Sequence, residues 1–348
     1  MTGRSEKQPD RKLSLAMVKL VLNVLEGKKV STVPNEIVEE LLDFSRSCGL
    51  HCLVAKALAE VGNEHAGEIF RECITQSMFF HRDLVMLDRI LAELAYTGAV
   101  LLKGGSLKYQ VYPDTALRPS VDIDLLVNPK EIYRVVKGFL THGFQIDSEA
   151  ILKRPVSGRL GYDIGIRHPD MNFMIEVHRG LSQQFRYSHP VDRLIMQAGP
   201  ISGFANIRAP SLQWQMVHGA IHMAQRGFKQ SFKHLLDIHI LKKQVGEQGV
   251  KQAFDLAELC GARRALYLTI KAAEIAFEYK QSPWNLLFSN TGPEVLNTNI
   301  NVVLAQVLTG FITTDSTSRF MRALLIKGSL LPLDLAFQKI ICGSDTKV

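Results

Sequence analysis

The sequence has no long apolar run. No segment of its 348 residues contains the ~18 consecutive apolar residues that a membrane-spanning helix needs. The apolar stretch near the start, LSLAMVKLVLNVLEG, is interrupted by Lys19 and is followed by no small-residue cleavage site, which argues against a secretory signal. We therefore expect no membrane insertion and a cytoplasmic location.

Cysteine is scarce as well. The five cysteines are odd in number and scattered along a long chain, which argues against a disulfide framework. Cys48 and Cys52 lie one helical turn apart with His51 beside them, but no further metal ligands are evident nearby. We therefore expect buried thiols, because an unpaired cysteine behaves as a small apolar residue.

Blocks of like charge, internal repeats and low-complexity tracts are also missing. The net charge of +7 and the pI of about 9.1 suit a polyanionic ligand such as a nucleotide or a nucleic acid. However, the basic residues do not form the long Lys/Arg tract that is typical of nucleic-acid binding. The composition is that of an ordinary soluble globular protein, with 46% hydrophobic and 22% charged residues.

Hydrophobic periodicity divides the chain into three parts. Apolar residues recur at three- and four-residue steps from about 12 to 97, which predicts helices. The pattern then changes to short β-type runs: AVLLKGG, VDIDLLV, GFQI, YDIGIRH and NFMIEVH. The last two runs are joined by PDMN, a plausible hairpin connection, and a helix is predicted over 129–142.

The pattern is helical again from about residue 190. Helical segments are predicted near 211–246, 248–279, 294–312 and 316–329. The sequence thus predicts an α+β fold, in which a small mixed-sheet core over 98–188 is flanked by an N-terminal helical region, 1–97, and a C-terminal helical region, 189–348.

The stretch LLKGGSL joins a short strand to a glycine pair. Gly104 and Gly105 allow close backbone approach and torsions that other residues avoid. Ser106 is a candidate N-cap for a short helix over SLKYQVYP, and the free N–H groups of such a turn bind anions. Ser106 would add a hydroxyl and Lys103 a charge. The spacing fits neither the Walker A nor the dinucleotide pattern, so a plain tight turn is the favoured reading of GGS by itself.

VDIDLLV carries two acids on one face. Asp122 and Asp124 are two residues apart on a predicted strand, and like charges so close repel unless a cation lies between them. Glu176 in MIEVH would supply a third carboxylate from another strand, with His178 on the same face. Three carboxylates can hold two Mg²⁺ ions, the arrangement used for nucleotidyl displacement. The alternative is a solvated pair of strand acids.

The order of these motifs resembles the polymerase-β-like nucleotidyltransferase superfamily. More narrowly, LLKGGSL, Tyr112-Pro113, Leu117-Arg118-Pro119, DIDLLV and IEVH are similar to a bacterial family of uncharacterised nucleotidyltransferases. The likeness covers roughly residues 80–245, and it includes the segment HGAIHMAQRGFKQSFKHLLDIHIL.

The resemblance implies a role for each matching residue. Asp122 and Asp124 would ligate Mg²⁺ that bridges the triphosphate of an NTP, and Glu176 would complete a second metal position and help deprotonate the acceptor. The implied nucleotide-binding residues are Lys103, Gly104, Gly105, Ser106 and Arg118. The glycines and the serine would hold the β- and γ-phosphates, and the two cations would neutralise phosphate charge.

Further polar residues lie on the predicted helix HGAIH and after it. His218 and His222 are four residues apart and so share a helix face. A zinc site is one reading, but no glutamate stands in the zincin position and no third ligand is clear. We favour the view that these histidines, with Asp237, line the acceptor side of the site or support it. The strand residue His178 has either such a role or one of simple packing.

The sequence therefore predicts a Mg²⁺-dependent nucleotidyltransferase. It would move NMP from an NTP, such as ATP, to a hydroxyl, phosphate or amine of a small-molecule acceptor and release pyrophosphate. One alternative is a non-catalytic nucleotide-binding or interaction module on the same fold. Another is transfer to a macromolecule, either tRNA or protein. The motifs leave open the NTP, the acceptor and the oligomeric state.

Overall fold

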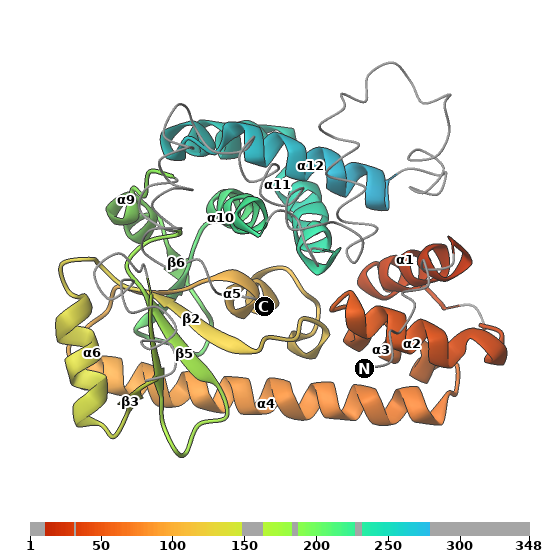
Figure 1. The fold of residues 1–348 in the computed structure, drawn as a ribbon, viewed down its shortest axis with the longest axis horizontal. Coiled ribbons are helices and arrows are strands. Elements are labelled where there is room, and N and C mark those ends of the chain that lie inside the picture. The colour runs from red at the N-terminus through yellow and green to blue at the C-terminus, as the bar shows by residue number, and fades with distance from the viewer. Residues whose placement is uncertain (1–10, 31–32, 148–162, 183–186, 227–231, 279–348) are drawn as a thin grey trace, which may run out of the picture.

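A computed structural model describes most of the chain (Figure 1). The described residues are 11–30, 33–147, 163–182, 187–226 and 232–278. The strands are β1 (Ala99–Leu101), β2 (Asp122–Leu126), β3 (Gln145–Ile146), β4 (Asp163–Arg167), β5 (Met174–His178), β6 (Gly199–Pro200) and β7 (Ile207–Ala209). They form one seven-stranded sheet in the order β3-β4-β5-β2-β1-β7-β6. This sheet and the surrounding helices confirm the α+β prediction.

The sheet mixes parallel and antiparallel pairs. β2 is parallel to β5 and antiparallel to β1, and β1 is parallel to β7. β4 and β5 form the predicted antiparallel hairpin. β6 and β7 were not predicted, because helices were expected from about residue 190. Runs of two and three residues are too short to show an alternating pattern, so periodicity could not indicate them.

The helices of the N-terminal half confirm the helical pattern over 12–97. They are α1 (Arg11–Leu25), the 3₁₀ turn η1 (Asn35–Ile37), α2 (Val38–Ser47), α3 (His51–Glu60) and α4 (Glu64–Glu93). The Asn63 side chain caps α4 by accepting a hydrogen bond of 2.8 Å from the Ala66 N–H. α1, α2 and α3 lie over the N-terminal half of α4, and the remainder of α4 runs beneath the sheet (Figure 1).

Helices cover both faces of the sheet. The remaining ones are α5 (Lys103–Gln110), the 3₁₀ turn η2 (Thr115–Leu117), α6 (Ile132–Thr141), α9 (Val191–Met196), α10 (Leu212–Gln225), α11 (Phe232–Cys260) and α12 (Arg263–Phe277). Ile123 and Leu125 pack in one apolar cluster with α4 and α6. Leu126 packs in a second cluster with α5 and α10. Since strand side chains alternate, Asp122 and Asp124 share the second face.

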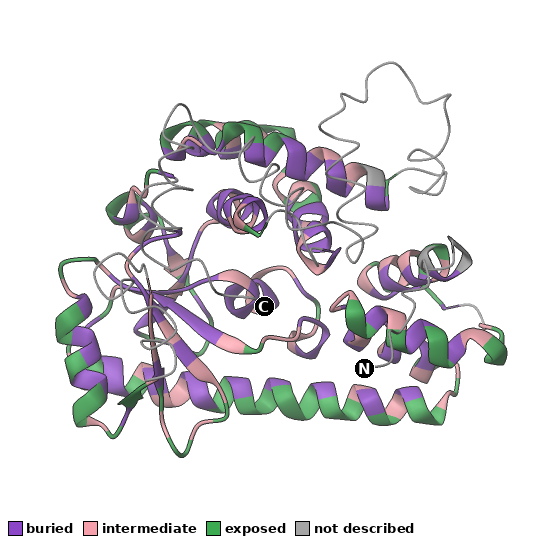
Figure 2. Ribbon diagram, in the orientation of Figure 1, coloured by how far each residue is buried: buried purple, intermediate pink, exposed green. Residues whose placement is uncertain are grey.

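α10 is buried along most of its length, as the purple ribbon in Figure 2 shows. It begins at the cap residue Ser211, whose side chain accepts a hydrogen bond from the Trp214 N–H. The helices predicted over 294–312 and 316–329 lie outside the described residues. The division of the chain at residues 97 and 188 stays a prediction. Within the described part of the chain, no helix is long and apolar enough to cross a membrane.

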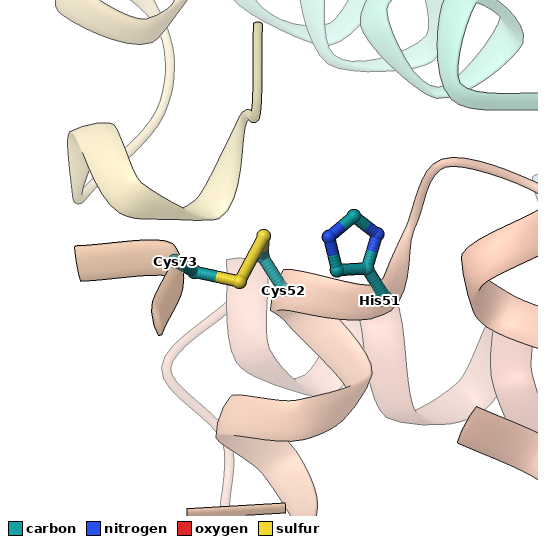
Figure 3. A group of neighbouring side chains, drawn as sticks. All are labelled: His51, Cys52 and Cys73. Carbon is teal, nitrogen blue, oxygen red and sulfur yellow. A yellow bond between two sulfur atoms is a disulfide. The ribbon is translucent and has the colours of Figure 1, made fainter. Parts of the chain in front are cut away.

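A disulfide joins α3 to α4 through Cys52 and Cys73 (Figure 3). This corrects the expectation of buried thiols at these two positions, whereas Cys48 and Cys260 are free. His51 lies beside the disulfide (Figure 3). The two cysteines are 21 residues apart, and only the packing of one helix on the other brings them together, so their spacing gave no signal.

Candidate functional site

Strands β2 and β5 bring two of the predicted acids face to face. In their parallel register, Asp124 is the partner of Glu176, and Leu126 is the partner of His178. Asp124, Glu176 and His178 therefore project from the same face, and one ligand atom of each lies within 4.8 Å of the others. Glu176, the expected third acid, thus does come from a neighbouring strand. Its role in the chemistry stays a prediction.

Two basic side chains contact the buried carboxylate of Asp124. Lys103 Nζ hydrogen-bonds to Asp124 Oδ1 and lies 3.8 Å from Glu176 Oε2. His178 Nε2 lies 2.7 Å from Asp124 Oδ1 and 3.4 Å from Glu176 Oε2. Lys103, predicted to contact phosphate, is therefore found at the carboxylates.

These contacts determine the charge states of the cluster. Burial by itself would raise the pKa of Asp124, but Lys103 and His178 outweigh it and hold that pKa below its usual range. Burial also opposes the charged form of His178, yet its hydrogen bonds to Asp124 and Glu176 raise the pKa to about 9. At neutral pH the cluster therefore contains an ionised Asp124 and a protonated His178.

Asp122 lies outside this tight group but close enough to sense it. Its side chain is half-buried, and burial together with the charge of Asp124 raises its pKa to about 6. The carboxylate of Asp122 is thus less well compensated than that of Asp124. An added cation would favour its ionised form.

The helix α5 begins earlier than predicted. Its first residue is Lys103 and its N-cap is Leu102, so Gly104, Gly105 and Ser106 belong to its first turn. The prediction that Ser106 caps the helix is therefore wrong. The left-handed torsion expected at a glycine occurs instead at Lys103, with φ of 51°. Such strain at a non-glycine residue is typical of functional sites.

Close packing explains the two glycines. A Cβ atom on Gly104 would lie 2.9 Å from Nη1 of Arg118, and one on Gly105 would lie 3.0 Å from Leu101 Cδ1 and 3.2 Å from Phe80 Cζ. All three distances are shorter than ordinary van der Waals contact. The GGS motif is thus required by the way α5 packs on its neighbours, whatever ligand it also binds.

Ser106 faces the interior. Its side chain is fully buried and its hydroxyl donates a hydrogen bond of 3.1 Å to the Lys103 carbonyl. The same oxygen accepts a hydrogen bond from Gln215 Nε2. A direct contact of this hydroxyl with phosphate, as the resemblance implied, has no support in this arrangement.

Arg118 and Asp237 form a buried, bidentate ion pair. Nε and Nη2 of Arg118 donate hydrogen bonds of 2.8 and 2.7 Å to the two carboxylate oxygens. The Tyr112 hydroxyl donates a further bond of 2.7 Å to Asp237 Oδ1. Although burial opposes ionisation, Arg118 holds the pKa of Asp237 well below its usual range. Asp237, predicted on the acceptor side, therefore anchors Arg118 to α11.

These residues surround a cavity of about 250 Å³. Four parts of the chain line it: 46–49 at the end of α2 and just after it, 103–105 at the start of α5, 118–122 with Asp124, and His222, Arg226, Lys233 and His234 in or next to α10 and α11. Arg46, Arg226 and Lys233 were not among the predicted site residues. They lie far from the motifs in sequence, and only the packing of the helices places them here.

The histidines of α10 and α11 are neutral. Burial lowers the pKa of His218 to about 3 and that of His234 to about 4, and it also lowers the pKa of His222 well below the usual value. His222 and His234 line the cavity, with ring centres 5.0 Å apart. Among the described residues, the groups with metal-binding spacing are His51 with the two disulfide cysteines and the Asp124 cluster. Neither contains a histidine of α10 or α11, so the zinc reading gains no support.

The chain matches one family model, whose description is uncharacterised nucleotidyltransferase. The match covers residues 34–278, which is more than half of the chain and extends from the 3₁₀ turn η1 through α12. It therefore includes every segment that lines the cavity. No curated protein and no solved structure matches the chain.

Proposed function

Because this chain belongs to the uncharacterised nucleotidyltransferase family, we propose that it transfers NMP from an NTP to an acceptor hydroxyl with release of pyrophosphate, in a Mg²⁺-dependent reaction. The observation that carries this proposal is the pairing of Asp124 with Glu176 on adjacent strands, with Asp122 on the same strand as Asp124 at a cavity lined by basic residues. Phosphoryl-group chemistry depends mainly on positioning and charge neutralisation, and such a site supplies both.

The donor set fits Mg²⁺. Asp122, Asp124 and Glu176 would hold the metal, because carboxylate oxygens are the ligands that this hard cation prefers. Burial and the nearby charge of Asp124 raise the pKa of Asp122 to about 6, and a bound cation would offset both effects. When bound, two such ions supply charge stabilisation for the attacking and leaving oxygens of an in-line displacement.

The chain's own residues prepare the site. Lys103 and His178 keep Asp124 ionised, and the buried pair Arg118–Asp237 fixes the guanidinium against Gly104. The N-terminus of α5 borders the cavity, and its partial positive charge favours phosphate there. We propose that Glu176, half-buried beside Asp124, accepts the proton of the acceptor hydroxyl.

We also propose a small-molecule acceptor, since four segments of the same chain surround the cavity. The cytoplasmic location stays a prediction. RNA and protein acceptors are outcomes that the same experiment can reveal.

The test is a screen of the four common NTPs with Mg²⁺ against metabolite and RNA pools, with pyrophosphate release as the readout. Wild type should release pyrophosphate with at least one combination, and Asp122→Asn and Asp124→Asn should lower the rate by about a thousandfold or more. Asp170→Asn is the matched control, because that carboxylate is 84% exposed beyond the site. Nucleotide binding without metal-dependent pyrophosphate release would instead favour the non-catalytic module.

A further inference from the structure

The cavity contains more cations than carboxylates. Lys103 and Arg118 line it, but each is matched by an acid of the same chain, Lys103 by Asp124 and Arg118 by Asp237. Their charges are thus largely balanced before any ligand binds. The remaining cations on the wall are Arg46, Arg226 and Lys233.

Lys233 is the most enclosed of these three. It is half-buried, whereas Arg46 and Arg226 are exposed. In the part of the chain that the structure describes, no carboxylate lies within ion-pair distance of Lys233 or Arg226, and Arg46 is 3.4 Å from the exposed Asp43. Withdrawing an ammonium from water without a counter-ion costs free energy. Such a group on a cavity wall indicates an anionic ligand.

The charges around Lys233 strengthen this indication. Burial and the neighbouring charge of Arg118 lower the pKa of Lys233 to about 8, and Arg226 lowers it as well. Asp237 and Asp122 act in the opposite direction, but burial and the two arginines outweigh them. Cavities lined by charge of one sign concentrate ligands of the opposite sign.

The N-terminal helices fix the course of the Lys233 side chain. Gly49, between α2 and α3, has φ of 72°, and a Cβ atom there would lie 2.7 Å from Cδ of Lys233. The backbone at Gly49 thus lies directly on the aliphatic stem. Glycine at position 49 permits both the left-handed torsion and this close approach. The packing of the N-terminal helices therefore determines where the ammonium group of Lys233 lies.

We propose that Lys233, flanked by Arg226 and Arg46, binds the phosphate tail of the nucleotide, the part that leaves as pyrophosphate. The identity of the ligand rests on the proposed function. The tail carries several negative charges, and the cations nearest the catalytic acids are already matched within the chain. Lys233 on α11, Arg226 at the end of α10 and Arg46 in the last turn of α2 supply the remaining neutralisation, Lys233 as a point charge and the arginines as planar donors. The N-terminal helices are thereby part of the nucleotide site.

The test is calorimetric binding to the full-length chain of a non-hydrolysable NTP analogue, inorganic tripolyphosphate, a nucleoside monophosphate and a sugar phosphate. Lys233→Met should weaken binding of the analogue and of tripolyphosphate by about tenfold or more, with little effect on the monophosphates. Lys251→Met is the control, because Lys251 is exposed and lies beyond the kink that Gly246 makes in α11. Unchanged tripolyphosphate affinity in Lys233→Met would overturn the proposal. So would a loss confined to the sugar phosphate, which would assign Lys233 to an anionic acceptor.

Gly49→Ala tests the placement of Lys233 without removing its charge. Gly62→Ala is its matched control, because Gly62 has φ of 89° and nothing within 4 Å of an added Cβ, so both variants carry backbone strain. Gly49→Ala should weaken tripolyphosphate binding and add little to the loss in Lys233→Met, as expected for two changes that act on one group. Equal effects of Gly49→Ala and Gly62→Ala would contradict the positioning role.

The two proposals fail in different ways. Tripolyphosphate binding requires no turnover, so Lys233-dependent binding without pyrophosphate release from any NTP would contradict the proposed function and retain an anion subsite. Pyrophosphate release with an unchanged KM for NTP in Lys233→Met would retain the proposed function and overturn the subsite.

Discussion

Asp124 and Glu176 are register partners on the parallel strands β2 and β5. Their side chains therefore leave the same face of the sheet side by side. Lys103 and His178 contact this pair, so the chain gathers opposite charges at one point.

Mg²⁺ or Mn²⁺ should stabilise the folded chain through these carboxylates. At a metal concentration a hundred times Kd, binding to the folded state alone adds about 2.7 kcal/mol to the free energy of unfolding. Thermal denaturation with and without metal measures this gain. Glu176→Gln should lose most of the shift, whereas Asp170→Asn should keep it. An equal shift in Glu176→Gln would place the metal elsewhere.

The ion pair between Arg118 and Asp237 should contribute strongly to stability. Asp237→Ala leaves the buried guanidinium of Arg118 without its counter-ion, and we expect a loss of about 3–5 kcal/mol in the free energy of unfolding. Tyr112→Phe removes one hydrogen bond to the same carboxylate and should cost about 1 kcal/mol. Urea denaturation compares the two variants. Similar small losses would show that Arg118 finds another partner.

The same pair predicts a pH dependence. The pKa of Asp237 is depressed in the folded chain, so its contribution is fully present above the unfolded pKa of about 3.9 and is lost as the pH falls towards the folded pKa. The difference in unfolding free energy between wild type and Asp237→Asn should be constant above about pH 5 and shrink by about 1.4 kcal/mol per pH unit below pH 3.9. Urea denaturation at several pH values tests this, and a difference that grows on acidification would contradict it.

Gly104 should tolerate no side chain. In Gly104→Ala the new methyl group would press on the Arg118 guanidinium, which Asp237 holds through Nε and Nη2. We therefore expect a loss of about 1–3 kcal/mol in the free energy of unfolding, together with lower activity. Gly67→Ala in α4 is the control, because its nearest contact would be 3.8 Å away and alanine should stabilise the helix by about 0.5–1 kcal/mol. A neutral effect of Gly104→Ala would mean that Arg118 can move aside.

The sequence predicted the features that depend on local pattern. Alternation in VDIDLLV placed Asp122 and Asp124 on one face, opposite Ile123 and Leu125, and the hairpin followed from PDMN. The sequence analysis also expected a third acid from a strand next to the two aspartates, and the pairing of β2 with β5 supplies it. These features need only the two-residue period of a strand and short-range turn chemistry.

Features that depend on helix packing could not be predicted. Arg46 and Lys233 are far apart in the sequence. They line the same cavity only because α2 and α11 approach each other. Cys52 and Cys73 pair because α3 lies on α4. The sequence by itself favoured a tight turn at GGS, and the resemblance implied phosphate binding there, whereas the close contacts of the two glycines with Arg118 and Phe80 depend on tertiary structure.

The fate of each phosphorus atom of the NTP tests the central claim most directly. Parallel reactions would contain NTP labelled at the α- or the γ-phosphorus, together with Mg²⁺ and the acceptor pool that supports pyrophosphate release. Our account predicts that the α-label becomes covalently attached to the acceptor and the γ-label leaves in pyrophosphate, with neither event in Asp124→Asn. Transfer of the γ-label to the acceptor, or incorporation of the α-label by Asp124→Asn at the wild-type rate, would contradict it.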